Sequence, residues 1–342
     1  MSESKYILVT GGAGYIGSHT VVELIGFGFI PVILDDFSNS TAQVIDGIQK
    51  ITQTDIIVRK VDVCDLEKTK AVFEEFNFVG IIHFAAFKAV GESVENPLSY
   101  YRNNLVGLIN VLDLAKTFNV NNLVFSSSCT VYGSPEGSKV VSEKTVLQEA
   151  NSPYGNTKRI GERIISDFIQ SGADIKVLNL RYFNPVGAHS SAHIGELPNG
   201  RPNNLLPAVT QSGIGKLGQI KVHGNDYDTI DGTCVRDYVH VVDVANAHVK
   251  GLTWLMKQSS ALNEHINIGT GKGTSVLEII HIFEQVSGVK LDWTFGPRRE
   301  GDVVEIYADA AKAREVLGWQ SNKTVEDAVS DAWNWELKLK ND

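Results

Sequence analysis

The sequence predicts an α/β fold: a doubly wound parallel sheet followed by a smaller mixed α/β C-terminal domain. Three observations support this prediction. Short runs rich in β-branched residues alternate with helical patterns through the first 181 residues, a glycine-rich turn joins the first run to the first helical segment, and the alternation stops after Arg181. Buried parallel strands have this composition, and a strand–helix–strand order returns each strand to the same sheet.

Each predicted strand is a short apolar run, and there are six, at Tyr6–Val9, Pro31–Leu34, Ile56–Val61, Gly80–Phe84, Leu123–Ser126 and Ile175–Arg181. The intervals between them leave room for crossover helices. Apolar residues at helical spacing predict four of these helices, at Tyr15–Gly26, Leu66–Phe76, Pro97–Phe118 and Tyr154–Gln170. Residues 1–181 are therefore expected to form one sheet with helices on both faces.

The second half of the chain lacks this alternation. A polar loop at residues 187–204, which contains glycine and proline, precedes a series of shorter elements. Later helices are predicted at Asp243–Lys257, Thr274–Ser287, Asp309–Leu317 and Val325–Lys338, and Gly318 would end the third of them. We expect residues 182–342 to form the smaller domain, from which some segments cross back to the first.

The composition excludes several classes of function. A chain of 342 residues with 43% hydrophobic content can bury a large core, and the net charge of −9 argues against a nucleic-acid partner. No signal peptide is evident and no apolar run reaches the roughly 18 residues of a membrane span, so no membrane partner is expected. Cys64, Cys129 and Cys234 are odd in number and lack Cys-x-x-Cys spacing, which favours a reducing, cytoplasmic location.

No metal site is expected. His189 and His193 have i, i+4 spacing, but they lie in the polar loop and no third ligand accompanies them. The segment Asp226–Gly232 superficially resembles a calcium loop. Ile230 occupies a position that requires an oxygen ligand, and the terminal glutamate is missing.

The glycine-rich turn reads Gly11-Gly12-Ala13-Gly14-Tyr15-Ile16-Gly17 and opens the first helix. Gly11 permits the tight turn, Gly14 lets the backbone approach a pyrophosphate, and Gly17 lets the helix pack on the strand. The alternative is an ordinary turn that needs glycine for its dihedral angles. Because the strand, the helix and a later acidic residue are all present, the pattern predicts a dinucleotide site at the helix N-terminus.

Acidic residues follow the second and third strands. Asp35 closes the second strand about 20 residues beyond the turn, where a carboxylate accepts from both ribose hydroxyls of adenosine and repels a 2′-phosphate. This position predicts NAD rather than its phosphorylated form. Asp36 beside it is a further cofactor candidate or is merely solvated. Asp62 is placed to meet the adenine amino group, or alternatively to cap the helix that starts at Leu66.

Three further residues predict hydride-transfer chemistry. Tyr154 and Lys158 are four residues apart on one helical face, so the ammonium can favour the phenolate and turn a phenol with a pKa near 10 into a usable base. Ser128 follows a strand end, and its hydroxyl would bridge Tyr154 and the substrate. Taken singly, the pair could be a solvated i, i+4 pair and the serine a turn residue. Together they predict a catalytic group.

Six longer segments add to these residues: Thr10–Ser18, His83–Ser93, Tyr182–Pro185, Pro202–Leu205, Gly232–His240 and Pro297–Asp302. With them, the chain resembles the extended short-chain dehydrogenase/reductase family almost from end to end. Within that family it is similar to the enzymes that invert carbon 4 of a UDP-linked hexose. The resemblance implies a Rossmann domain that binds NAD in residues 1–181, a UDP-sugar-binding domain in residues 182–342, and a homodimer that pairs Pro97–Phe118 and Tyr154–Gln170 with their copies.

The resemblance also assigns roles to residues. The cofactor would be bound by the glycine turn, the acidic residues and the catalytic pair, together with Tyr15, Ile16, Asn39, Val63, Phe84, Ala85, Ala86, Lys88, Asn103 and Tyr182. The UDP-hexose would be bound by Ser128, Tyr154, Asn184, Asn204, Leu205, Val222 and His223, its phosphates by Arg236 and Arg299, and its ribose by Asp302. Guanidinium forks suit a pyrophosphate, although each arginine could instead form a structural salt bridge.

The activity implied is interconversion of UDP-glucose and UDP-galactose through a 4-keto sugar, as part of galactose metabolism. A nucleotide-sugar 4,6-dehydratase is the nearest alternative, but such enzymes carry an Asp-Glu pair where this chain has Cys129 and Thr130. A non-catalytic dinucleotide sensor is a second alternative, which the catalytic residues argue against.

Two positions depart from the family pattern. His223 stands where phenylalanine is usual, which could weaken stacking on uracil, and Ile306 is intermediate in size at a position that limits the hexose. We expect weak turnover of N-acetylhexosamines at best.

Overall fold

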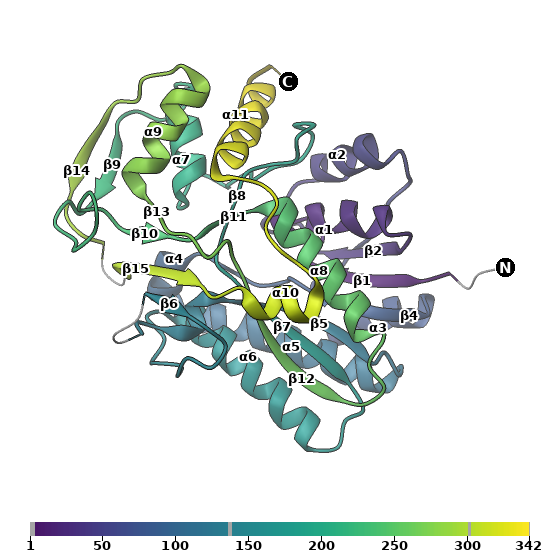
Figure 1. The fold of residues 1–342 in the computed structure, drawn as a ribbon. Coiled ribbons are helices and arrows are strands. Elements are labelled where there is room, and N and C mark those ends of the chain that lie inside the picture. Colours follow the sequence, from purple (N-terminus) through teal and green to yellow (C-terminus); the bar gives the residue numbers. More distant parts are fainter. Residues whose placement is uncertain (1–3, 136–138, 300–301, 342) are drawn as a thin grey trace.

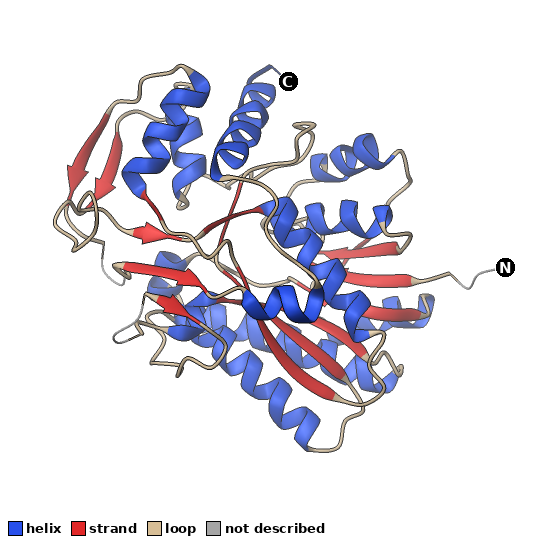
Figure 2. Ribbon diagram, in the orientation of Figure 1, coloured by secondary structure: helices blue, strands red, loops and turns tan. Residues whose placement is uncertain are grey.

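The computed structural model describes residues 4–135, 139–299 and 302–341. A large sheet with helices on both faces lies beside a smaller group of helices and short strands (Figures 1 and 2). The strands of the large sheet are all parallel and run in the order β12-β7-β5-β4-β1-β2-β3. Their bounds are β1 Tyr6–Thr10, β2 Ile30–Asp35, β3 Ile57–Lys60, β4 Phe78–His83, β5 Asn122–Ser128, β7 Lys176–Tyr182 and β12 Leu262–Ile268.

The chain order reverses on either side of β1, since β2 pairs with one of its edges and β4 with the other. In open α/β sheets, ligands bind in the crevice at the carboxyl ends of the strands at such a reversal. This topology therefore points to the ends of β1, β4 and β5 as the place for a site.

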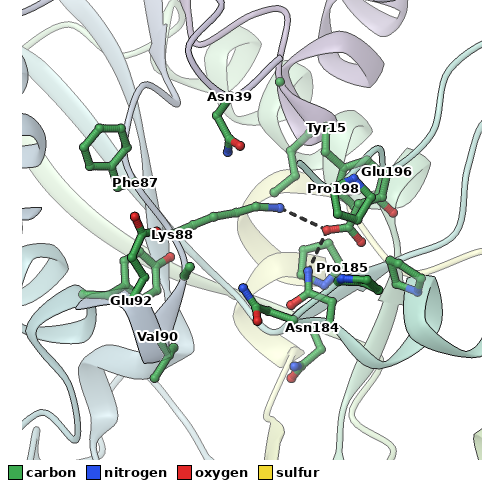
Figure 3. A pocket seen from close by; sticks show the side chains of 18 of the residues that line it. Tyr15, Asn39, Phe87, Lys88, Val90, Glu92, Asn184, Pro185, Glu196 and Pro198 are labelled. Carbon is green, nitrogen blue, oxygen red and sulfur yellow. Dashed lines mark hydrogen bonds and ion pairs between the residues drawn. The ribbon is translucent and has the colours of Figure 1, made fainter. Parts of the chain in front are cut away.

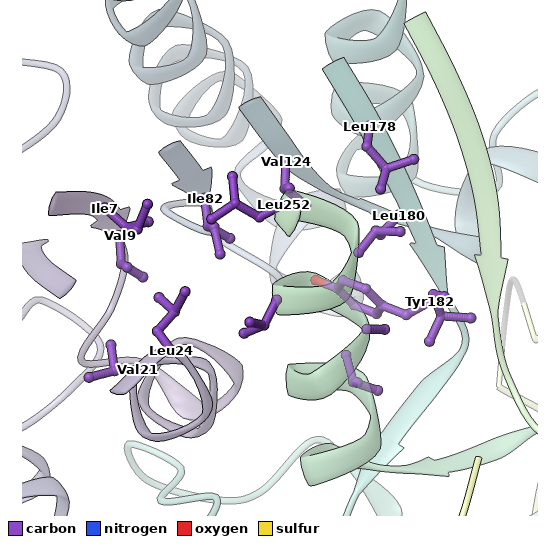
Figure 4. Close-up of a cluster of buried hydrophobic side chains, with 14 of the residues drawn as sticks. Ile7, Val9, Val21, Leu24, Ile82, Val124, Leu178, Leu180, Tyr182 and Leu252 are labelled. Atoms are coloured by element: carbon purple, nitrogen blue, oxygen red, sulfur yellow. The ribbon is translucent and has the colours of Figure 1, made fainter. Parts of the chain in front are cut away.

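A hydrophobic core lies on each face of the sheet, between its strands and the helices that cover them. On one face, α1 (Tyr15–Gly26) and α8 (Val241–Leu255) pack on the strands. Figure 4 shows Leu24 of α1 and Leu252 of α8 among strand residues such as Ile82. The other face is covered by α3 (Leu66–Glu75), α5 (Pro97–Thr117) and α6 (Pro153–Gln170). The five inner strands are thus buried on both faces, as the apolar runs predict, whereas the edge strands β3 and β12 are partly exposed.

The smaller part has a core of its own, between α7 (Leu205–Gly213), α9 (Val276–Ser287) and α11 (Val325–Asn341). The short strands form three small sheets. These are β9 Ile220–His223 with β14 Trp293–Gly296, β8 Asn184–Val186 with β11 Tyr238–His240, and a sheet of β13 Thr274–Ser275, β10 Val235–Arg236, β15 Glu305–Ala308 and β6 Val140–Val141. The remaining elements are α2 Gln43–Thr52, α4 Val90–Glu95, α10 Ala311–Leu317 and the 3-10 helix η1 Cys129–Tyr132.

All six predicted strands and all eight predicted helices are present, with small shifts at their ends. Gly318 ends α10 in the left-handed conformation, as expected of a glycine helix stop. Thr274 and Ser275 are an exception, because they form β13 and Ser275 then caps α9. The prediction missed α2, α4, α7, η1 and β12, and it gave no bounds for the short strands outside the large sheet.

The missed strand β12 pairs with β7 in the large sheet, and α8 and α10 pack against the same sheet. Elements beyond residue 181 therefore lie on both parts of the molecule. The boundary between residues 181 and 182 stays a prediction. Within the described residues, no helix is both long and apolar enough to span a membrane.

Candidate active site

A cavity of about 1730 Å³ lies at the carboxyl ends of the large sheet and extends into the smaller part. Every residue to which the sequence gave a catalytic, cofactor or substrate role lines it. Residues far apart in the sequence, such as Gly11 and Asp302, thus line the same cavity. The roles of the individual residues stay predictions.

At one end of the cavity, the glycine turn brings two backbone segments close together. Gly11 has a φ of +68°, and a Cβ there would lie 2.7 Å from the Ala85 nitrogen. A Cβ on Gly17 would lie 2.2 Å from the carbonyl oxygen of Gly11. The N-cap of α1 is Gly14, which has no side chain to satisfy the first amides of the helix. This close-packed turn with an uncapped helix N-terminus fits the pyrophosphate of a dinucleotide.

The carboxylate of Asp35 is buried beside this turn. It accepts hydrogen bonds from the backbone amides of Ala13 at 3.0 Å and Phe37 at 2.9 Å, and from the hydroxyl of Ser40 at 3.0 Å. Burial raises the pKa of Asp35, and these hydrogen bonds oppose the rise. Since a carboxylate has about four lone-pair sites, one is left for a ribose hydroxyl.

Asp62 is exposed at the cavity wall, and its side chain accepts from the amide of Cys64 at 2.8 Å. The alternative role of Asp62 as a helix cap is wrong, because Asp65 caps α3 by accepting from the amide of Lys68. The adenine role of Asp62 stays a prediction.

The three candidate catalytic residues are buried where β5 and α6 meet. Ser128 is the last residue of β5, and Tyr154 and Lys158 lie in the first turns of α6. This helix starts at a fixed place, because Ser152 caps it by accepting from the Gly155 amide at 3.2 Å and a proline follows.

Lys158 does not bond to Tyr154. Its ammonium donates to the carbonyl of Ser126 at 2.6 Å and lies 6.0 Å from the centre of the Tyr154 ring. Burial raises the pKa of Tyr154 well above its ordinary value, and a hydrogen bond with Ser128 lowers it again in part. Burial also lowers the pKa of Lys158 to about 8, against a raising effect of Glu162. The described residues thus show no direct hydrogen bond between the two side chains, and the activation of Tyr154 by Lys158 stays a prediction.

A buried polar network behind these residues was not predicted. The carboxylate of Glu162 accepts from the Ser127 hydroxyl at 2.6 Å and from two nitrogens of Arg181, at 2.9 and 2.6 Å. It fixes α6 to the ends of β5 and β7. The sequence did carry a signal, because Glu162 continues the i, i+4 series of Tyr154 and Lys158 on one helix face.

At the far end of the cavity, Asp302 lies between two arginines, 3.5 Å from Arg236 and 3.4 Å from Arg299. Charge-assisted hydrogen bonds are usually shorter, about 2.7–2.9 Å, so both guanidinium groups can still bind a phosphate. The ring of His223 reaches the carbonyl of Pro297 at 3.2 Å, and Ile306 is buried in the wall. Glu300 and Gly301, also part of the motif at 297–302, lie outside the described residues.

Glu196 is a further cavity residue that the sequence did not reveal. Its carboxylate accepts from the ammonium of Lys88 at 3.1 Å and from the amide of Asn204 at 2.6 Å (Figure 3). Glu196 belongs to the polar loop and Lys88 follows β4, so no local pattern could join them.

The chain matches the family model described as GDP-mannose 4,6 dehydratase over residues 8–332. It is 48% identical over 330 residues to a UDP-glucose 4-epimerase of Bacillus subtilis (strain 168), covering 96% of each chain. Two solved structures are also similar. One is a UDP-glucose-4-epimerase of Stenotrophomonas maltophila with bound NAD and formylated UDP-arabinopyranose. Its TM-score is 0.95 at 44% sequence identity, and the match covers 98% of this chain and 99% of that one. The other, a Bifidobacterium longum enzyme in complex with NAD+ and UDP, has a TM-score of 0.94 and 41% identity at the same coverage.

Proposed function

Because the chain belongs to the UDP-glucose 4-epimerase family, as well as to the family described as GDP-mannose 4,6 dehydratase, we propose that it interconverts UDP-glucose and UDP-galactose with tightly bound NAD, in galactose metabolism. The observation that supports this most directly is the cavity: one space of about 1730 Å³ joins the glycine turn, the buried Ser128, Tyr154 and Lys158, and the arginine pair. It offers room for a dinucleotide and a nucleotide sugar together.

When bound, NAD supplies a reversible hydride acceptor for carbon 4 of the sugar. Tyr154 removes the proton of the 4-hydroxyl through Ser128, so that carbon 4 becomes a ketone, and gives the proton back once the other face of the ring is presented. Lys158 is anchored to the Ser126 carbonyl and keeps a positive charge 6.0 Å from the centre of the Tyr154 ring. Because burial raises the pKa of Tyr154, we expect the positive nicotinamide ring of a bound NAD, together with Lys158, to favour the phenolate.

The sugar ring can turn over only if the UDP group stays fixed. We assign the UDP contacts to Asn184, Asn204, Leu205, Val222, His223, Arg236, Arg299 and Asp302, all of which line the distal end of the cavity. Asp302 would pass from the arginines to the uridine ribose when the phosphates bind. In this division, residues 1–181 form the NAD-binding domain and residues 182–342 the UDP-sugar-binding domain.

The dehydratase alternative requires a second acid–base pair after Ser128. Burial raises the pKa of the Cys129 thiol to about 12, so this group stays protonated at neutral pH and cannot act as a base. Thr130 is also unsuited to act as a base, because its buried hydroxyl has no hydrogen-bond partner that could take its proton. These two residues therefore provide no acid–base pair for elimination across carbons 5 and 6.

Purified protein incubated with UDP-galactose, without added NAD, should yield UDP-glucose. A hydrogen isotope placed on carbon 4 should stay with the sugar, because the hydride leaves and returns within one cavity. Loss of the label to solvent would exclude this mechanism, and a 4-keto-6-deoxy product would favour the dehydratase.

Ile306 is buried in the cavity wall beside the candidate hexose region, with 5% of its surface exposed. We expect UDP-N-acetylglucosamine to be a poor substrate, because an N-acetyl group needs space that this side chain occupies. Replacing Ile306 with alanine should raise kcat/KM for the N-acetylated sugar relative to UDP-glucose by about tenfold, measured by product analysis with both substrates. Efficient turnover of the N-acetylated sugar by the unchanged protein would contradict this role.

We further propose that the protein is a cytoplasmic homodimer. Large apolar side chains are exposed on neighbouring helices, with Val94 of α4 at 62%, Leu98 of α5 at 72% and Ile109 of α5 at 42% exposure. A second copy of the chain would cover them. The three cysteines are free, as a reducing compartment would keep them.

A further inference from the structure

We propose that Glu196 is a positioning residue that couples the NAD side of the cavity to the UDP side. The inference rests on the proposed function, since it names how two parts of the same site depend on each other. One carboxylate oxygen, Oε1, accepts from both Lys88 at 3.1 Å and Asn204 at 2.6 Å. In Figure 3 the side chain of Lys88 extends to the carboxylate of Glu196, and a dashed line marks their contact.

Lys88 belongs to the cofactor side. It follows β4 in the segment that packs against the glycine turn, and its ammonium lies 5.6 Å from the centre of the Tyr15 ring. Tyr15 is the first residue of α1, and its hydroxyl donates to the carbonyl of Gly187 at 2.6 Å. Lys88 is thus held between a ring beside the glycine turn and a carboxylate from the polar loop.

Asn204 belongs to the nucleotide side. It occupies the N-cap position of α7, yet its side chain makes no capping hydrogen bond to that helix. An asparagine at this position usually bonds to the amides of the first turn. Here its amide nitrogen is turned to Glu196 instead, which leaves its carbonyl oxygen to face a ligand. Glu196 therefore sets the orientation of Asn204.

Glu196 itself is firmly placed. Its backbone carbonyl accepts from the indole nitrogen of Trp335 on α11 at 3.0 Å, and a Cβ on Gly195 would lie 2.5 Å from the same indole. Its side chain is only 12% exposed, against 46% for Lys88. Because the backbone of Glu196 is held by Trp335, its carboxylate can order the side chains of Lys88 and Asn204 before either ligand binds. Less conformational entropy is then lost on binding.

The consequence is that the effects of Lys88 and Asn204 on binding are not independent. Removing the charge of Lys88 weakens the hold on Glu196 and hence on Asn204, and the reverse is also true. Removing Glu196 breaks the connection. Coupling between sites usually amounts to about 5- to 150-fold in affinity, and two hydrogen bonds to one carboxylate place this case near the lower end.

The test is a double-mutant cycle on the affinity for UDP, measured by titration calorimetry in saturating NAD. The proteins are wild type, K88A, N204A and K88A/N204A, and the same four with Glu196→Ala. We expect Glu196→Ala to raise the Kd of UDP about tenfold. With Glu196 present, the change in Kd caused by K88A/N204A should differ about fivefold from the product of the changes caused by K88A and by N204A. Without Glu196, this difference should disappear. If the product rule holds with Glu196 present, or the deviation survives Glu196→Ala, the proposal is wrong.

Two further variants separate positioning from folding. Glu196→Gln keeps an oxygen for Asn204 but loses the charge that holds Lys88, so its Kd should lie between those of wild type and Glu196→Ala; a value equal to wild type would contradict the role of the charge. Glu315→Ala, at an exposed acid on α10, is the control and should bind UDP as wild type does. UDP carries no hexose and needs no turnover. Failure of wild type to bind it would refute the proposed function, whereas loss of coupling alone would refute only this inference.

Discussion

At the scale of single residues, burial controls the protonation of the candidate catalytic groups. Burial raises the pKa of Tyr154, so its phenol is neutral at neutral pH, whereas Lys158, with a pKa of about 8, is still mainly charged. A neutral phenol next to a cation is ready to lose its proton when a second positive charge arrives. We therefore expect the positive nicotinamide of a bound NAD to lower the pKa of Tyr154.

Changing Tyr154 to phenylalanine tests this role. The variant should lose turnover of UDP-galactose by a factor on the order of 10² or more, since no other described group at the end of β5 can take the proton. NAD should stay bound, because the ring and the glycine turn remain, and absorbance with mass spectrometry of the denatured protein would measure it.

The control is Tyr6 changed to phenylalanine. Tyr6 starts β1 and packs against Phe76, outside the residues that line the cavity. Turnover should be unchanged. A Tyr154 variant as active as this control would remove the basis of the proposed mechanism.

At the scale of elements, the turn before α1 depends on close contact between backbones. Changing Gly17 to alanine would place a methyl group 2.2 Å from the Gly11 oxygen and 2.8 Å from the Gly12 Cα, and neither backbone atom can swing aside. We expect a loss of about 1–3 kcal/mol in the free energy of unfolding and much weaker NAD binding.

The same helix provides a matched control for this change. Gly26 ends α1, and a Cβ there would meet no atom within 4 Å. Gly26 changed to alanine should keep NAD and gain up to about 1 kcal/mol in stability from the lower entropy of the unfolded chain. Urea unfolding and fluorescence titration with NADH measure both quantities. Equal behaviour of the two variants would show that the close turn is not required.

Another prediction at this scale concerns the exposed faces of α4 and α5. Changing Leu98 and Ile109 to glutamate should give a monomer in sedimentation velocity at micromolar concentration, because each lost apolar side chain costs a dimer about 1.5–3 kcal/mol per copy. Val146, which is 74% exposed in a loop, provides the control when changed to glutamate. A wild-type protein that sediments as a monomer would end the dimer proposal.

At the scale of the whole molecule, strong local patterns were sufficient to predict most of the fold. Apolar β-branched runs identified six of the seven strands of the large sheet. The seventh, β12, begins with Leu262, but the polar residues Asn263, Glu264 and His265 follow at partly buried positions. Because β12 is an edge strand, its sequence shows no continuous apolar run. A strand of this kind is specified by its partner β7 rather than by its own composition.

The candidate site shows the same limit. Motif spacing found many of the residues that line the cavity, but it could not find contacts between distant segments. Lys88 and Glu196 are 108 positions apart, and Glu196 lies in a loop with no period. The spacing of Tyr154 and Lys158 correctly put them on one helix, but only the end of β5 explains why the ammonium bonds to Ser126 instead.

Three buried histidines predict how the whole fold responds to acid. Burial lowers the pKa of His19 and His83 to about 3 and that of His248 to about 4. The Nδ1 atoms of His19 and His248 each bond to a carbonyl in the preceding helical turn at 2.8 Å, and their Nε2 atoms have no partner. A proton added at Nε2 would thus be buried without an acceptor.

The sign of the effect follows from proton counting. In the unfolded chain these imidazoles titrate near pH 6.5, so between about pH 6.5 and pH 3 the unfolded state binds more protons and stability falls as the pH falls. Each histidine should lower the free energy of unfolding by about 2–3 kcal/mol between pH 6.5 and pH 4.5. The three losses together are comparable to the total stability of a typical domain, about 5–15 kcal/mol.

The urea concentration at the unfolding midpoint, measured across this pH range, should therefore drop steeply. His248 changed to glutamine should flatten the drop, whereas His281, which is exposed, should leave it unchanged when replaced in the same way. An equal slope in both variants would mean that His248 is protonated in the folded protein at pH 4.5.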